Sequence, residues 1–194
     1  MSLRHVLLAL LSKEPNTGYG AGRLLRGQLS HLWDARLQQI YAELAKLQSD
    51  GLVEAESFDL PNRPAKKVYT LTAAGEAALN EWLSERSPPL NYRDDFLVRL
   101  YCLERIPEDV LVHTLEERLS EWEAEATKLR DALAQNPRTD PARLGALLTL
   151  EAALARTEAL ARWCAKALSR LDERQQSEDT QRLPARRGRA RASA

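Results

Sequence analysis

Residues 35–71 decide the fold, and they read ARLQQIYAELAKLQSDGLVEAESFDLPNRPAKKVYTL. The first part of this stretch repeats apolar residues at the spacing of a helix, and the second part has the composition of two short strands. Between the parts stands Gly51, a residue type that readily takes the left-handed conformation just beyond a helix. The stretch therefore predicts a helix over residues 35–50 followed by a β-hairpin.

The predicted helix has one apolar stripe and one polar face. Asp34 is a residue type that caps helix N-termini well, so we expect it to be the N-cap. The stripe is expected to be buried, and it consists of Leu37, Ile40, Tyr41, Leu44 and Leu47. The hairpin strands are expected over residues 52–58 and 67–71, joined by a loop at residues 61–64 with a basic tip.

Three further helices are predicted around this stretch. Residues 3–11 follow helical spacing, residues 14–20 interrupt the pattern with Pro and Gly, and a second short helix runs to about Gln28. Thr72 is expected to cap a fourth helix that ends near Ser87. Its apolar positions are Leu79, Trp82 and Leu83. The order helix, helix, helix, hairpin, helix is typical of a winged helix-turn-helix module with a two-stranded β-wing.

Beyond the Pro88-Pro89 pair the pattern is helical throughout. Pro107 opens one long helix, residues 136–141 turn the chain, and a second long helix follows. The apolar positions are Phe96, Leu97, Leu100 and Tyr101, then Val110, Leu111, Leu115, Leu119, Trp122, Leu129 and Leu133, then Leu144, Leu147, Leu148, Leu154, Leu160, Trp163 and Leu171. Helices this long need a partner for their apolar faces, and a second copy of the chain is the simplest one. The fold class is therefore mainly α, with a C-terminal long-helix dimerisation domain.

Composition excludes several classes of protein. The 194 residues are 44% hydrophobic, with 8 Gly and 9 Pro, which argues against an all-β sandwich and a disulfide scaffold. Cys102 and Cys164 lie far apart in apolar patterns, so we expect two reduced core thiols. The three histidines have no metal-ligand or triad spacing, and there is no phosphate loop, so we expect neither an enzyme nor a metal or cofactor. No apolar run is long enough for a membrane span, and we expect a cytoplasmic protein.

The formal net charge is zero, but the charges are unevenly distributed. Residues 1–86 are balanced, residues 87–181 are acidic, and residues 182–194 contain five arginines without an acid. Because the C-terminal end has no hydrophobic periodicity, we expect it to be a disordered Arg-rich tail over residues 175–194. It is either a source of loose phosphate affinity or a solvated terminus without a role.

Several motifs in order resemble the PadR family of bacterial winged-helix transcriptional regulators. They are Leu8-Ala9-Leu10-Leu11, Thr17-Gly18-Tyr19-Gly20, Leu32-Trp33, Gln39 to Leu44, Asp50 to Val53, Arg63 to Tyr69, and Leu71-Thr72 with Gly75. From Tyr92 onward the chain looks like the subgroup with a virulence-activator type C-terminal domain. The chain departs from the family pattern at Gln38 and Ala42, both on the third helix, so its target sequence is expected to differ.

The resemblance makes the third helix a recognition helix, and its polar side chains are of the types that reach base edges and phosphates. Arg36, Gln38 and Gln39 are the candidates for bases, and Lys46 is a candidate for phosphates. Tyr41 is either a DNA contact or a core residue, and the polar positions are alternatively an ordinary solvated face. At the wing, Arg63, Lys66 and Lys67 are candidates for the DNA backbone, or else a solvated loop.

Some PadR-like regulators bind planar aromatic effectors at the dimer interface, and this resemblance implies a role for tryptophan. The candidates for effector binding are Trp33, Trp122 and Trp163. The alternative is that these side chains simply fill a helical core.

Together these observations predict a homodimeric, sequence-specific DNA-binding repressor that recognises an inverted-repeat operator. Residues 1–87 are expected to form the winged-helix DNA-binding domain, and residues 90–174 the dimerisation domain. Because the first domain is not basic overall, the alternative is a winged-helix protein–protein interaction module without DNA binding.

Overall fold

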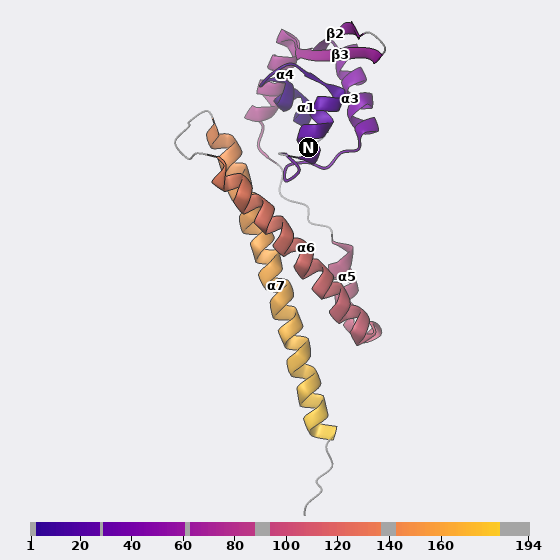
Figure 1. The fold of residues 1–194 in the computed structure, drawn as a ribbon, viewed down its shortest axis with the longest axis vertical. Helices are drawn as coiled ribbons and strands as arrows, with labels where there is room; N and C mark the ends of the chain where they lie inside the picture. The colour runs from indigo at the N-terminus through magenta and orange to yellow at the C-terminus, as the bar shows by residue number, and fades with distance from the viewer. Residues whose placement is uncertain (1–2, 28, 61–62, 88–93, 137–142, 183–194) are drawn as a thin grey trace, which may run out of the picture. The chain divides into compact units, whose positions relative to one another are not determined.

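The computed structural model describes residues 3–27, 29–60, 63–87, 94–136 and 143–182. The chain forms two compact units, Met1–Asn91 and Tyr92–Ala194, each of which has its own core. The fold is mostly helical with one small antiparallel sheet, and the predicted fold class is confirmed (Figure 1).

The first unit is a winged helix-turn-helix. Its helices are α1 (Leu3–Leu11), α2 (Gly18–Arg26), α3 (Leu37–Ser49) and α4 (Ala73–Ser84). Its strands are β1 (Asn16–Thr17), β2 (Val53–Leu60) and β3 (Arg63–Leu71), in the order β1-β3-β2 with both neighbouring pairs antiparallel. The sequence did not predict β1, because two residues are too short a stretch to show alternation.

The core of the first unit lies where the helices meet the sheet. Its fully buried side chains are Leu7, Leu8, Leu25, Ile40, Leu44 and Leu47. The core fixes α3, because Ile40, Leu44 and Leu47 form one stripe at helical spacing. Tyr41 was predicted to belong to this stripe, but 45% of it is exposed.

Helix α2 begins inside the stretch that was predicted to break the helical pattern. Thr17 explains this, because its Oγ1 accepts a hydrogen bond from the Gly20 amide at 2.9 Å and so caps the helix. Gly18 is required there for a second reason, since a Cβ at that position would collide with the ring of Tyr41. The glycines therefore permit close packing of α2 against α3 instead of ending a helix.

The predicted N-cap of α3, Asp34, is wrong. The chain stays extended through Arg36, which is the N-cap, and Ala35 is buried in the core. The side chain of Gln39 satisfies the helix start, because its Oε1 accepts a hydrogen bond from the Arg36 amide at 2.9 Å. Burial of Ala35 thus moves the helix start two residues along the chain, out of reach of Asp34.

The C-terminal end of α3 and the start of α4 follow the prediction. Gly51 has a φ of +70°, the left-handed conformation expected just beyond a helix. Thr72 joins the two helices, since its hydroxyl donates to the Gly51 carbonyl at 2.8 Å and accepts from the Gly75 amide at 3.1 Å. Helix α4 ends at Ser84, three residues before the predicted end, and Leu83 is exposed on it instead of buried.

The wing is longer than predicted. Strand β2 extends to Leu60 and strand β3 begins at Arg63, so the predicted loop residues Arg63 and Pro64 belong to a strand. The pairing is regular from Val53 opposite Leu71 to Phe58 opposite Lys66, and then shifts in register near the tip. The residues of the regularly paired part therefore have defined faces.

The second unit consists of α5 (Asp95–Tyr101), a 3₁₀ turn (Leu103–Arg105), α6 (Glu108–Ala134) and α7 (Leu144–Arg182). Pro107 precedes α6, as predicted. Helices α6 and α7 run antiparallel and pack on one another (Figure 1). Two small clusters hold them together, one around Leu111, Leu115 and Cys164 and the other around Leu129, Leu150 and Ala153.

Many apolar side chains of the second unit are exposed in the single chain. They are Leu97, Val98, Tyr101, Val110, Leu144, Leu148 and Trp163. Cys102 is also exposed, so the expectation of a core thiol holds for Cys164 and is wrong for Cys102.

Helix α7 differs from the predicted tail. It continues to Arg182, so residues 175–182 are helical where disorder was expected, and residues 183–194 lie outside the described residues. The predicted boundary at Pro88-Pro89 and most of the predicted turn at residues 136–141 also lie outside them. No described helix has the length and apolar character needed to cross a membrane.

Candidate nucleic-acid interface

The predicted polar face of α3 is exposed. Its candidate residues are Arg36, Gln38, Gln39, Tyr41 and Lys46, all of which are exposed while the opposite stripe is buried. A helix held by one stripe presents its other face as a rigid surface, which is the requirement for entry into a major groove.

Gln39 has a structural task that the sequence did not reveal. Its Oε1 already accepts the Arg36 amide, so the side-chain NH₂ is the group left to face outward. An NH₂ group can donate to the N7 and O6 acceptors of purines. Gln38 has no such bond among the hydrogen bonds of the described residues, and its whole amide is available.

Tyr41 lies between the core and the surface. Its ring packs on Gly18 of α2, and part of it remains exposed. Tyr41 also interacts electrostatically with Tyr69. The pKa of the Tyr69 phenol is raised, mainly by burial and to a smaller extent by Tyr41. Both of the predicted roles of Tyr41, packing and surface contact, therefore remain compatible with its position.

Lys46 stands on the last turn of α3 and has only a weak ion pair. Its Nζ lies 3.8 Å from Glu43 Oε2, and its side chain is well exposed. Exposed pairs of this kind contribute about 0–1 kcal/mol, so the ammonium group can exchange Glu43 for a phosphate at little cost.

The two wing lysines point in opposite directions, although the sequence grouped them in one basic tip. Lys67 shares its strand face with the buried Tyr69, and its Nζ donates to Gln48 Oε1 of α3 at 3.2 Å. Lys66 lies on the other face, paired with Phe58. Only the backbone of the third candidate, Arg63, is described, at the start of β3.

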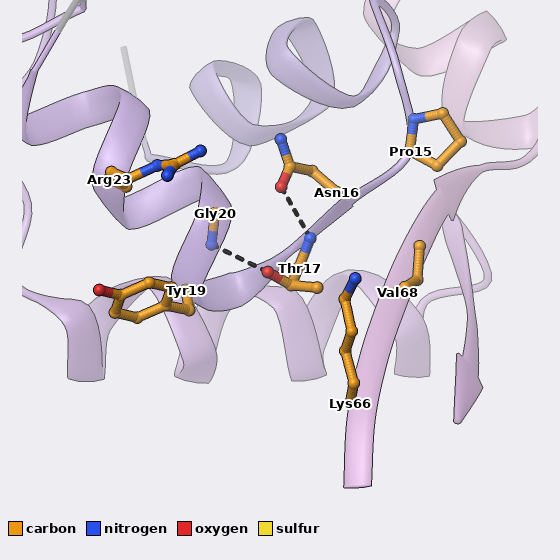
Figure 2. A pocket seen from close by; sticks show the side chains of 8 residues that line it. All are labelled: Pro15, Asn16, Thr17, Tyr19, Gly20, Arg23, Lys66 and Val68. Carbon is orange, nitrogen blue, oxygen red and sulfur yellow. Dashed lines mark hydrogen bonds between the residues drawn. The ribbon is translucent and has the colours of Figure 1, made fainter. Parts of the chain in front are cut away.

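Lys66 instead belongs to a hollow of about 370 Å³ at the start of α2 (Figure 2). We call it the α2 hollow, and its walls include Asn16, Thr17, Tyr19, Arg23, Lys66 and Val68. Neither Arg23 nor Tyr19 was a candidate from the sequence, because Tyr19 lies in the stretch expected to break the helical pattern and Arg23 lies in a helix to which no site was assigned. The spacing of four residues between them, after the capping residue Thr17, is the signal that could have placed both on one helix face.

The three candidate tryptophans belong to different units. Trp33 packs against the core of the first unit, and Trp122 and Trp163 belong to the second unit. Trp163 meets the ring of Phe96 edge-on, with 6.3 Å between the ring centroids. The second unit has a cavity of about 500 Å³ beside α5, but Phe96, Val98 and Val110 line it, and neither Trp122 nor Trp163 does.

The described residues contain no group of three His, Cys, Asp or Glu side chains that could hold a metal ion. What the first unit presents is an exposed helix face bordered by cations, an arrangement that binds nucleic acid by donating hydrogen bonds and neutralising phosphates.

Comparisons with known proteins agree with this arrangement. Residues 7–81 match the model of the PadR-like transcriptional regulator family, and residues 92–172 match that of the virulence activator alpha C-terminal domain. The negative transcriptional regulator PadR of Bacillus subtilis is 30% identical over 179 residues, which cover 88% of this chain and 98% of that protein.

Solved structures give the same result. The crystal structure of Bacillus subtilis PadR in complex with operator DNA superposes with a TM-score of 0.76 at 26% identity, covering 87% of this chain and 98% of that one. The complex of the same protein with p-coumaric acid gives 0.70 at 27% identity, covering 88% and 98%. The alternative of a docking module that does not bind DNA finds no support in these matches. This chain belongs to the PadR-like family and is a DNA-binding transcriptional regulator, not an enzyme.

Proposed function

We propose that this regulator is a homodimeric repressor that binds an inverted-repeat operator with the exposed face of α3 and the wing. The observation that carries the proposal is the division of α3 into a buried stripe and an exposed face of Arg36, Gln38, Gln39, Tyr41 and Lys46. It is supported by the likeness to a protein that has been solved with operator DNA.

The side chains divide by chemistry. Arg36, Gln38 and the NH₂ group of Gln39 are the candidates for base edges, because bidentate donors at a helix N-terminus discriminate between bases. Lys46 and the wing residues Arg63, Lys66 and Lys67 are the candidates for backbone phosphates, which give affinity and register but no sequence information.

The exposed apolar surface of the second unit supports the dimer. Leu97, Val98 and Tyr101 of α5 are exposed, Tyr101 by 90%, and α7 adds Leu144 and Leu148. Apolar surface of this extent on helices marks an interaction site. A second copy is the partner we propose, since two-fold symmetry then matches an inverted repeat with one α3 in each half-site.

Repression and an aromatic effector are proposed by analogy with the Bacillus subtilis relative, which is named a negative regulator and has been solved with p-coumaric acid. For this chain, Trp33, Trp122 and Trp163 remain the candidate effector contacts. A ligand that binds one arrangement of the dimer better than the other would shift the spacing of the two α3 helices. A regulator of bacterial DNA acts in the cytoplasm, where we place this protein.

The test is fluorescence anisotropy with a labelled DNA fragment from upstream of the protein's own gene, with random-sequence DNA as competitor. We expect unlabelled operator DNA to displace the labelled fragment from the protein and random-sequence DNA not to displace it. The affinity is expected to fall steeply as the salt concentration rises. Equal competition by both DNAs would overturn the sequence-specific function. Addition of p-coumaric acid to the same complex then tests effector release.

A further inference from the structure

The α2 hollow lies where three elements meet. Strand β1 leads into α2, and β3 passes beside β1, with Asn16 opposite Tyr69 and Thr17 opposite Val68. Lys66 stands on β3 just past the end of this pairing, and Arg23 stands on the next turn of α2. In Figure 2 the guanidinium group of Arg23 and the ammonium group of Lys66 both point toward Asn16 and Thr17.

The hollow contains two like charges without a counter-charge. No carboxylate lines it, and Arg23 and Lys66 have neither an ion pair nor a hydrogen bond in the part of the chain that the structure describes. Two other cations of this unit do have an acidic neighbour: Arg4 pairs with Asp50 at 2.7 Å, and Lys46 lies near Glu43. Two unpaired cations that face one hollow repel each other until an anion lies between them.

Two backbone amides at the helix start already have partners. Thr17 accepts the Gly20 amide, and Asn16 Oδ1 accepts the Thr17 amide at 2.9 Å (Figure 2). The charged donors that line the hollow, the Arg23 guanidinium and the Lys66 ammonium, therefore remain available, and the Asn16 NH₂ group and the Tyr19 hydroxyl add two neutral donors. A guanidinium beside an ammonium favours a phosphate oxygen pair, because the planar fork of arginine binds two oxygens and lysine adds a point charge.

We propose that Arg23 and Lys66 together bind one phosphodiester group of the DNA backbone in the α2 hollow. This proposal rests on the proposed function, and it adds α2 to the DNA-binding surface. It also separates the two wing lysines: Lys66 acts with Arg23 on one phosphate, and Lys67, held by Gln48, acts independently on the side of α3.

The position of the hollow favours DNA over a free anion. Tyr41 on the exposed face of α3 packs on Gly18, the first residue of α2, and Tyr19 beside it is 60% exposed. The wing thus lines the hollow through Lys66, and α3 packs on Gly18, which stands between the lining residues Thr17 and Tyr19 in the chain. DNA that follows both elements passes the hollow with its backbone, and the hollow is open enough to admit a phosphate that remains part of a strand.

The experiment measures the affinity of the full-length protein for a labelled random-sequence duplex, since a phosphate contact is independent of sequence. The variants are Arg23→Gln, Lys66→Gln and the double variant. Lys67→Gln, alone and combined with Arg23→Gln, is the matched control on the same strand. Each single variant is expected to weaken binding by about three- to tenfold and to reduce the salt dependence.

Coupling is the decisive readout. Because Arg23 and Lys66 share one phosphate, their double variant is expected to lose clearly less than the product of the two single losses. Arg23→Gln with Lys67→Gln is expected to lose the full product. Thermal melting checks folding. Arg23→Gln and Lys66→Gln are expected to leave Tm unchanged, because these two side chains have no partner in the described residues. Lys67→Gln removes the hydrogen bond to Gln48 and is expected to lower Tm slightly.

Two results would overturn the inference and leave the proposed function intact. One is an Arg23→Gln variant that binds DNA as the unmodified protein does; the other is full additivity of Arg23 and Lys66. A rise of Tm with inorganic phosphate that Arg23→Gln abolishes, without any change in DNA affinity, would assign the hollow to a free anion instead. Failure of the unmodified protein to bind any duplex would remove both the inference and the proposed function.

Discussion

The two units of this chain differ in how completely they bury their apolar side chains. The first unit closes its short helices around one core, where Leu7, Ile40 and Leu47 have no exposed surface. The second unit has two long helices held by two small clusters, and it leaves apolar side chains such as Val98 and Tyr101 in solvent. The difference teaches that the first unit buries its helices around one core of its own, whereas the second has apolar side chains on its long helices that its own core does not cover.

A substitution in the core of the first unit tests whether this unit unfolds independently of the second. Leu47→Ala removes a fully buried side chain and is expected to cost about 2–5 kcal/mol of unfolding free energy. Urea denaturation followed by circular dichroism is expected to show the first unit unfolding early while α6 and α7 remain helical. Leu148→Ala, at an exposed position, is the matched control and is expected to leave the first transition unchanged. A single transition shifted as a whole would contradict the division into two units.

Charge on the exposed apolar surface tests the second unit. The double variant Val98→Asp with Leu148→Asp is expected to be monomeric by analytical ultracentrifugation, because two carboxylates would have to be buried between copies. Operator affinity is expected to fall by about a hundredfold or more, since each half-site then binds one chain alone. Ser120→Asp, at an exposed polar position on α6, is expected to remain dimeric. A double variant that stays dimeric would place the interface elsewhere.

Within the first unit, two neighbouring glutamines are expected to behave differently. Gln38→Ala is expected to reduce discrimination at one base position by about 1–3 kcal/mol and to leave Tm unchanged. Gln39→Ala also removes the hydrogen bond to the Arg36 amide, so it is expected to lower stability by about 0.5–1.5 kcal/mol in addition. Binding to operators with single base changes, together with thermal melts, separates the two effects. Identical losses of stability would contradict the capping role of Gln39.

Lys46→Ala probes a phosphate contact without base reading. It is expected to weaken operator and random DNA equally and to reduce the slope of log affinity against log salt by about one. The weak pair with Glu43 makes the effect on stability small. A loss confined to the operator would reassign Lys46 to base recognition.

The smallest expected effect concerns pH. Burial raises the pKa of Tyr69 in the folded protein, so the phenol is favoured in its neutral form. The stability that this provides is fully present below the ordinary tyrosine pKa near 10 and is lost as pH rises through the higher folded value. Tyr69→Phe is therefore expected to weaken the fall of Tm above about pH 10. An unchanged alkaline profile would show that Tyr69 ionises freely in the fold.

The order of elements could be predicted from sequence because its signals are local. Gly51 and Thr72 act on their own neighbours, and the stripe of Ile40, Leu44 and Leu47 repeats at one period. Asp34 is a residue type that caps helices well, but α3 begins beyond its reach because Ala35 is buried in the core. That burial depends on the packing of the whole unit and cannot be predicted from local signals.

The site was predicted less completely, because it depends on register. Adjacent residues of a strand face opposite sides, so the directions of Lys66 and Lys67 follow from pairing with β2 and not from their neighbourhood in sequence. The role that we propose for Arg23 could not be predicted for a related reason. It depends on β1, which brings the start of α2 beside β3.

Sedimentation of the protein with labelled operator DNA, in the presence of excess random-sequence DNA, tests the central claim most directly. We expect a complex of two chains on one inverted repeat that survives the competitor, and no comparable complex on a single half-site. One chain bound per duplex, or a complex that random DNA removes as readily as the operator does, would contradict it.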